Sequence, residues 1–186
     1  MLIQNTNLKD LFLVERNIFE DERGTFSRIY SESEILRTGS FTKPVQVNTS
    51  FSKQKGTLRG IHFQYPPYSE AKLVSCVTGS VWDVGVDLRP NSPTRFQWYG
   101  VELSPRNGLQ LLVPQGFGHA FITLEANTTL VYMINQVYNL EYESGVRFDD
   151  PMIGVNWPLK PSVISDKDKS WPRLEERIED LDKKFT

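Results

Sequence analysis

The sequence predicts an all-β fold, either a sandwich or a barrel, and two observations support this prediction. Short runs rich in Val, Ile, Phe, Tyr and Thr recur along the chain and are separated by Gly, Pro and Asn. Apolar residues at helical spacing are confined to one short stretch and the C-terminal tail. Many short strands with little helix are typical of β-sandwiches and barrels, which can hold a ligand where alternate side chains converge.

The predicted strands follow one another at short intervals. They are Leu11–Arg16, Thr25–Tyr30, Val45–Ser52, Leu58–Tyr65, Lys72–Thr78, Ser80–Leu88, Phe96–Leu103, Gly108–Val113, His119–Thr123, Thr128–Val137 and Gly145–Phe148. The run from Ser80 to Leu88 alternates most clearly: its odd-numbered residues share one face, and its even-numbered residues, Trp82 among them, share the other. The pair Thr78-Gly79 before this run predicts a hairpin turn.

Two segments predict helices. Ser31–Arg37 is long enough for a turn or two, and Trp171–Phe185 has Pro172 in its first turn. The tail carries apolar residues at helical spacing, namely Leu174, Ile178, Leu181 and Phe185. We expect this stripe to pack on a sheet, with partner binding as the alternative. The chain has no linker, low-complexity tract or repeat, so we expect one domain over residues 1–186.

Charge and composition bear on the class of partner and on the compartment. The chain has 21 Lys and Arg against 23 Asp and Glu, a net charge of −2, so its charge favours neither nucleic acid nor a membrane as main partner. No stretch has the ~20 apolar residues of a membrane span, and the N-terminus lacks the pattern of a secretion signal. The single cysteine, Cys76, lies in a strand-like run and fits a buried side chain in a reducing compartment, so we expect a cytoplasmic protein.

The first of two histidines, His62, lies in the apolar stretch TLRGIHFQYPP. Strict alternation places His62 and Arg59 on opposite faces of a strand. Glycine within a strand often marks a bulge, so a bulge at Gly60 could turn both side chains into one cavity. The alternative is an ordinary strand histidine with a satisfied hydrogen bond.

The second histidine, His119, lies in VPQGFGHAF. The pattern Pro-x-Gly-x-x-His resembles the second motif of cupin barrels, in which that histidine is a metal ligand. With two histidines in the chain, a three-histidine metal site is impossible. A site of two histidines and one carboxylate stays open, although no His-x-His or His-x-Asp pair supports it. We therefore expect no metal.

Two further segments have both a structural and a functional interpretation. The segment ISDKDKSWP, residues 164–172, holds Asp168 and Lys167 and has the composition of a solvated charged loop. Tyr132 and Tyr138 are six residues apart, hence on one face if their strand runs on unbroken, where an aromatic core stripe is the structural alternative.

Several long segments occur in the order typical of one family of enzymes. They are FEDERGTF (19–26), QVNTSFS (46–52), GTLRGIHFQYPP (56–67), AKLVSCVTGSVWDVGVDLRPNSPT (71–94), VPQGFGHAF (113–121), ESGVRFDDPMIGVNWP (143–158) and SDKD (165–168). On these segments, which span nearly the whole chain, the sequence resembles the dTDP-4-dehydrorhamnose 3,5-epimerase family. The resemblance implies a cupin-like jelly roll and a substrate that is a nucleoside-diphosphate 4-keto sugar.

The resemblance also implies the chemistry. The carbons beside the ketone, C3 and C5, carry weakly acidic protons, so a base removes one and an acid returns a proton to the opposite face. No cofactor or metal is required, in agreement with the lack of a GxGxxG fingerprint. By similarity, His62 is the base, Asp168 orients it, and Tyr132 is the acid. Lys72 stabilises the enolate oxygen.

The resemblance extends to substrate-binding residues and to a partner. His119 and Arg59 are implied to bind the sugar and diphosphate, and Tyr138 to flank the sugar. A homodimer with an exchanged N-terminal strand is implied, and the residues that match the family's nucleotide contacts are Arg23, Phe26, Gln46, Asn48, Glu143 and Lys167.

One departure bears on specificity. Arg28 stands where the family usually carries Glu, which leaves CDP-, UDP- and GDP-sugars open beside the dTDP-sugar that is the default. Inversion at C3 alone or C5 alone also stays open. The alternatives from other classes are a non-catalytic sugar-nucleotide-binding cupin and a metal-dependent cupin enzyme, and the histidine count disfavours the second.

Overall fold

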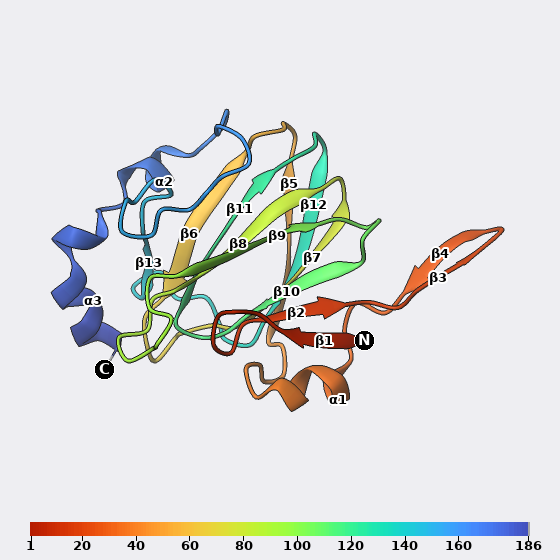
Figure 1. Cartoon of the computed structure of the whole chain (residues 1–186), viewed down its shortest axis with the longest axis horizontal. Coiled ribbons are helices and arrows are strands. Elements are labelled where there is room, and N and C mark those ends of the chain that lie inside the picture. Colours follow the sequence, from red (N-terminus) through yellow and green to blue (C-terminus); the bar gives the residue numbers. More distant parts are fainter. Residues whose placement is uncertain (186) are drawn as a thin grey trace.

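Two antiparallel sheets form a sandwich in the computed structural model, which describes residues 1–185 (Figure 1). The six-stranded sheet has the order β1 (Leu2–Asn5), β2 (Phe12–Glu15), β10 (Leu109–Val113), β7 (Lys72–Thr78), β12 (Thr128–Ile134) and β5 (Gln46–Ser52). The five-stranded sheet has the order β13 (Glu143–Gly145), β6 (Leu58–Gln64), β11 (Phe117–Thr123), β8 (Val81–Asp87) and β9 (Trp98–Leu103). The predicted all-β fold is confirmed.

The remaining elements are short. β3 (Ile18–Asp21) and β4 (Gly24–Ser27) pair only with each other and form a hairpin arm that extends away from the sandwich (Figure 1). The helical segments are α1 (Glu32–Ile35), η1 (Leu36–Thr38), α2 (Asp166–Ser170), η2 (Leu174–Glu176) and α3 (Ile178–Phe185). No helix among residues 1–185 is long and apolar enough to cross a membrane.

The alternation of β8 explains how the sandwich is layered. Val81 belongs to the core between the two sheets, together with Leu111, Leu130 and Phe121. The even-numbered residues of β8 pack instead on the outer face of the five-stranded sheet, where Leu181 of the C-terminal segment covers them. The predicted faces of this strand and the predicted packing of the tail stripe are confirmed. The tail differs from the single predicted helix, because η2 and α3 divide it.

Two strands and one turn also differ from the sequence predictions. β1 and β3 were not predicted, because their backbones are paired but their side chains show little burial. The Thr78-Gly79 turn does not form a hairpin: it joins β7 in one sheet to β8 in the other. A turn sequence encodes a chain reversal but not the sheet to which the next strand adds.

The strand predicted as Thr128–Val137 ends earlier. β12 ends at Ile134, and the side chain of Asn135 accepts a hydrogen bond from the Ala71 N–H at 2.7 Å. The amide thus takes the place of a further ladder bond, and Tyr138 lies outside the strand. The unbroken strand that would place Tyr138 on one face with Tyr132 therefore does not form.

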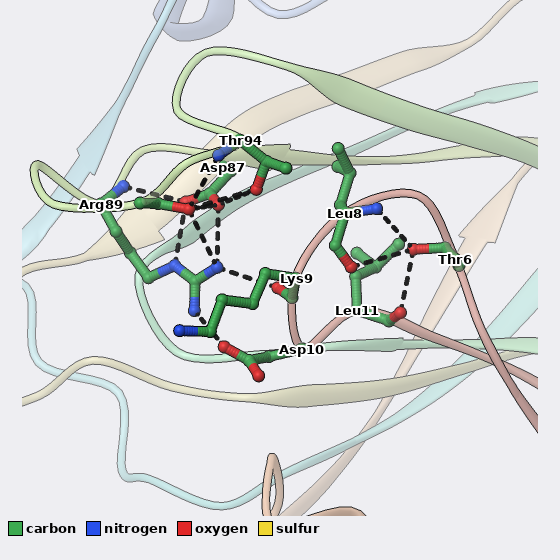
Figure 2. Close-up of polar contacts among 9 residues, drawn as sticks. Thr6, Leu8, Lys9, Asp10, Leu11, Asp87, Arg89 and Thr94 are labelled. Carbon is green, nitrogen blue, oxygen red and sulfur yellow. Dashed lines mark hydrogen bonds and ion pairs between the residues drawn. The ribbon is translucent and has the colours of Figure 1, made fainter.

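A polar network anchors the β1–β2 connection to the end of β8. Figure 2 shows the guanidinium of Arg89 between Asp87 and Asp10. Asp87 is fully buried and also accepts hydrogen bonds from Ser92 and Thr94. Burial opposes the charge of Asp87, but these donors outweigh it and lower its pKa. The network stabilises the fold at a distance from the cavity described next, which none of these residues lines.

Candidate active site

A cavity of about 440 Å³ lies between the two sheets, a volume suited to a small ligand. Its walls come from β5, β6, β7, β11, β12 and the segment that leads into α2. The lining residues are Ser50, Thr57, Leu58, Arg59, His62, Lys72, His119, Phe121, Tyr132, Val163, Ile164, Ser165, Lys167 and Asp168.

A bulge in β6 brings Arg59 and His62 to the same cavity. His62 pairs with His119 and Arg59 with Phe121, so three steps along β6 oppose two along β11. The bulge includes Gly60, which has a φ of +121°, and a Cβ added there would lie 2.4 Å from the Cβ of Ala120. Only glycine fits this close approach. The predicted bulge is confirmed.

His62 and Asp168 form a hydrogen-bonded pair on one wall. The Nε2 atom of His62 lies 2.6 Å from Oδ1 of Asp168, while Oδ2 accepts the Gly60 N–H at 3.2 Å. Asp168 is buried, although its segment has the composition of a solvated loop. The reason is local: Ser165 caps α2 by accepting the Asp168 N–H, which turns this carboxylate toward β6.

The charge of Asp168 fixes the tautomer of His62. Burial raises the pKa of Asp168, but hydrogen bonds from His62, Gly60 and Ser165 outweigh burial and lower it. An ionised carboxylate only accepts, so Nε2 carries the proton that it shares with Asp168. The lone pair on Nδ1 of His62 is then free to act as a base.

The opposite wall belongs to the six-stranded sheet and carries Tyr132 and Lys72. Lys72 pairs across the ladder with Ile134, and Tyr132 lies two residues before Ile134 on the same face of β12. The phenol and the ammonium therefore face the cavity from the sheet opposite His62. The Nζ of Lys72 lies 3.0 Å from the carboxylate of Glu70.

His119 is paired with a carboxylate that sequence reasoning missed. Its Nε2 lies 2.8 Å from Oδ1 of Asp83, which is fully buried. Asp83 lies on the odd-numbered face of β8, which the sequence alternation identified. A buried charge on that inward face was the available signal, because a carboxylate there needs a partner.

Tyr138, Glu143 and Lys167 form a chain of contacts beside the cavity. The Tyr138 hydroxyl donates to Glu143 at 2.7 Å, and Lys167 Nζ lies 2.6 Å from the other oxygen of Glu143. The bond to Glu143 raises the pKa of Tyr138. Burial opposes the charge of Glu143, but the hydrogen bonds from Lys167 and Tyr138 outweigh it and lower its pKa. Gln46 of β5 accepts the Tyr138 N–H at 2.9 Å.

The chain does not bring every expected residue to the cavity. Arg23 and Phe26 lie on the hairpin arm, where they line a separate hollow, and Arg28 lies near its base. Gln46, Asn48, Tyr138 and Glu143 are not among the lining residues. Within residues 1–185, no group of three or more His, Cys, Asp and Glu side chains is arranged to hold a metal ion.

Comparison with known proteins identifies the family. The family model described as dTDP-4-dehydrorhamnose 3,5-epimerase matches residues 5–176. The chain belongs to the dTDP-4-dehydrorhamnose 3,5-epimerase family. A dTDP-4-dehydrorhamnose 3,5-epimerase of Sinorhizobium fredii is 42% identical over 175 residues, which cover 94% of this chain and 90% of the relative. The resemblance stated from the sequence is confirmed.

Solved structures of the same family share the fold. A dTDP-4-dehydrorhamnose 3,5-epimerase from Elizabethkingia anophelis matches with a TM-score of 0.89 and 42% identity, over 95% of this chain and 98% of that one. The Bacillus anthracis family member, solved with TDP and PPi bound, matches with a TM-score of 0.87 and 41% identity, over 93% and 99%.

Proposed function

We propose that this protein inverts C3 and C5 of dTDP-4-dehydro-6-deoxy-D-glucose and produces dTDP-4-dehydro-L-rhamnose. One observation carries the proposal: the His62–Asp168 pair and the Tyr132 phenol line one cavity from opposite sheets. A sugar ring between the sheets would meet a base on one face and an acid on the other, as inversion requires. Membership in the family supports this substrate.

In the proposed mechanism, Nδ1 of His62 removes the proton beside the ketone. The imidazole becomes an imidazolium, which the Asp168 carboxylate stabilises at 2.6 Å. The electron pair released at carbon moves onto the C4 oxygen, which becomes an enolate. Removal of the proton is therefore coupled to a negative charge on that oxygen.

The enolate needs a cation in a site that excludes most water, and Lys72 supplies it from the opposite wall. Tyr132 then donates its proton to the carbon from the face opposite His62, and the centre is inverted. A phenol is a weak acid, yet it suffices against a strongly basic carbanion. In this proposal, His62 accepts the proton that leaves the sugar and Tyr132 donates the proton that replaces it.

Arg59, His119 and Lys167 line the same cavity as His62. We assign Arg59 and His119 to the sugar and diphosphate and Lys167 to the nucleotide, because a guanidinium binds two phosphate oxygens at once. Tyr138, held by Glu143, flanks the sugar. Gln46 and Asn48, on the inward face of β5, are assigned to the nucleotide.

The proposal includes a homodimer in which the hairpin arm of one subunit completes the site of the other. The arm extends away from its own sandwich (Figure 1), and it exposes Phe19 and Phe26 by 63% and 68%. The edge strand β5 also exposes Val47 by 60%. Exposed apolar side chains on an arm and an edge strand favour contact with a second copy.

Complementation between two inactive variants tests the exchange. A His62→Ala subunit keeps its arm, and an Arg23→Ala subunit keeps its cavity. Randomly mixed dimers should regain about a quarter of the wild-type activity, because one site in each heterodimer is intact. No recovery, with dimers formed, would refute the exchange.

The reaction itself is tested in heavy water with 4-keto-6-deoxy sugars linked to dTDP, CDP, UDP and GDP. We expect deuterium at C3 and C5 of the dTDP-sugar, and none with His62→Ala. A wild-type protein that binds the dTDP-sugar without deuterium entry would instead favour the non-catalytic binding domain. Deuterium at one carbon alone would indicate a single-site epimerase.

The same four sugar nucleotides test which nucleobase the protein prefers. Arg28, a cation where the family usually carries Glu, is assigned to the base, so Arg28→Glu should change the relative affinities for the four nucleotides. Unchanged affinities would exclude that role. We also place the protein in the cytoplasm, on the single, buried cysteine, Cys76.

A further inference from the structure

Lys72, the proposed enolate stabiliser, is paired with a carboxylate that the family resemblance does not include. Its Nζ lies 3.0 Å from Oε1 of Glu70, and the two side chains retain only 12% and 8% of their exposure. In the described part of the chain, Glu70 is the one charged group that pairs with this ammonium. The short distance and the burial of both side chains restrict where the ammonium of Lys72 can lie.

The second oxygen of Glu70 is unusual. Oε2 is buried and has no hydrogen-bond donor among residues 1–185. A buried carboxylate oxygen without a donor is costly, so a side chain that only fills space gains nothing from being a carboxylate. The contact with the ammonium of Lys72 therefore accounts for a carboxylate at position 70.

The loop that holds Glu70 does not depend on its side chain. The residue before it, Ser69, accepts a hydrogen bond from Gln115 at its carbonyl at 2.8 Å. The residue after it, Ala71, donates its N–H to the side chain of Asn135 at 2.7 Å. Since other residues fix the backbone on both sides, an isosteric change of Glu70 should leave the loop in place.

We propose that Glu70 is a positioning residue of the epimerase reaction: it fixes the ammonium of Lys72 on the wall of the cavity that also carries Tyr132. The cation then faces the oxygen on which negative charge develops. This inference rests on the proposed function. Glu70 acts through Lys72 and does not touch the sugar, so it should affect the chemical step more than binding.

Two substitutions of opposite character separate this role from packing. Glu70→Gln keeps the shape and removes the charge, and Glu70→Asp keeps the charge and withdraws it by one methylene. We expect Glu70→Gln to lower kcat by about 10- to 100-fold, less than the ~10²–10³ lost with a direct donor. Its KM should stay within about threefold. Glu70→Asp should retain more activity than Glu70→Gln, whereas a packing role predicts the reverse order.

A double-mutant cycle gives the second readout. In a Lys72→Met background, Glu70→Gln should cause little further loss, because the group through which it acts is gone. The control is Glu179→Gln, an exposed glutamate on α3, which should match the wild type. Deuterium exchange is measured for all variants, with melting temperatures to establish folding.

The outcomes distinguish the two proposals. An active wild type whose Glu70→Gln variant keeps full kcat overturns the inference alone. An equal loss in both backgrounds, or a greater loss with Glu70→Asp than with Glu70→Gln, also overturns it. A wild type without exchange overturns the proposed function and this inference with it.

Discussion

Replacing Asp168 with Asn changes the chemistry of one side chain at almost constant volume. The native carboxylate uses two acceptors: Oδ1 for the Nε2–H of His62 and Oδ2 for the Gly60 N–H. An amide has only one acceptor oxygen. Because the Gly60 N–H can only donate, it draws the amide oxygen to itself, and the amide NH₂ then faces His62.

That orientation reverses the tautomer of His62. Nε2 must now accept, so the proton moves to Nδ1 and no lone pair faces the substrate. The variant also loses the charge-assisted hydrogen bond to the imidazolium, worth about 1.5–3 kcal/mol. At ~1.4 kcal/mol per factor of ten, this loss alone slows deprotonation by about 10- to 150-fold. With the tautomer reversed as well, we expect a decrease in kcat of about 10³-fold or more.

The assay is deuterium entry at C3 and C5, followed by NMR in heavy water. Asp166→Asn is the matched control, since Asp166 lies on the same helix with a fully exposed side chain. It should stay within about twofold of the wild type. If Asp168→Asn folds and keeps more than a tenth of the wild-type exchange rate, the tautomer argument is wrong.

Four other predictions concern the candidate site and the buried core. Tyr132→Phe should slow inversion more than proton exchange, because His62 still works from its own face; an equal loss of both would mean another role. Gly145→Ala should destabilise the fold by about 1–3 kcal/mol, measured by denaturant unfolding. The added Cβ would lie 2.4 Å from the ring of Trp171, and that ring packs against His62. Burial raises the pKa of Cys76 to about 12, so native protein should resist alkylation at pH 8, and rapid labelling would show that the site opens. The pKa of Asp168 lies below its ordinary 3.8, so its contribution to stability is present above pH 3.8 and is lost as the pH falls further. The free energy of unfolding of Asp168→Asn should therefore depend less on pH in acid than that of the wild type. Identical acid transitions would contradict the assignment.

The catalytic candidates differ in how visible they were in the sequence. The bulge at Gly60 was predictable, because a glycine within an apolar strand is a local signal. Asp168 was identified through the resemblance, since its segment alone has the composition of a solvated loop. Glu70 carried no signal, because no local pattern says that a loop carboxylate lies 3.0 Å from Lys72.

The amino-acid pattern by itself determined the fold class, most of the strands and the faces of β8, because alternation and turn residues act over a few neighbouring positions. The tertiary structure decided which strands share a sheet, where β12 ends and which carboxylate pairs with each histidine. Those contacts join residues as far apart as His62 and Asp168, and they depend on how the two sheets close around the cavity. Sequence spacing holds no information on that closure, since burial and charge pairing are properties of the assembled sandwich.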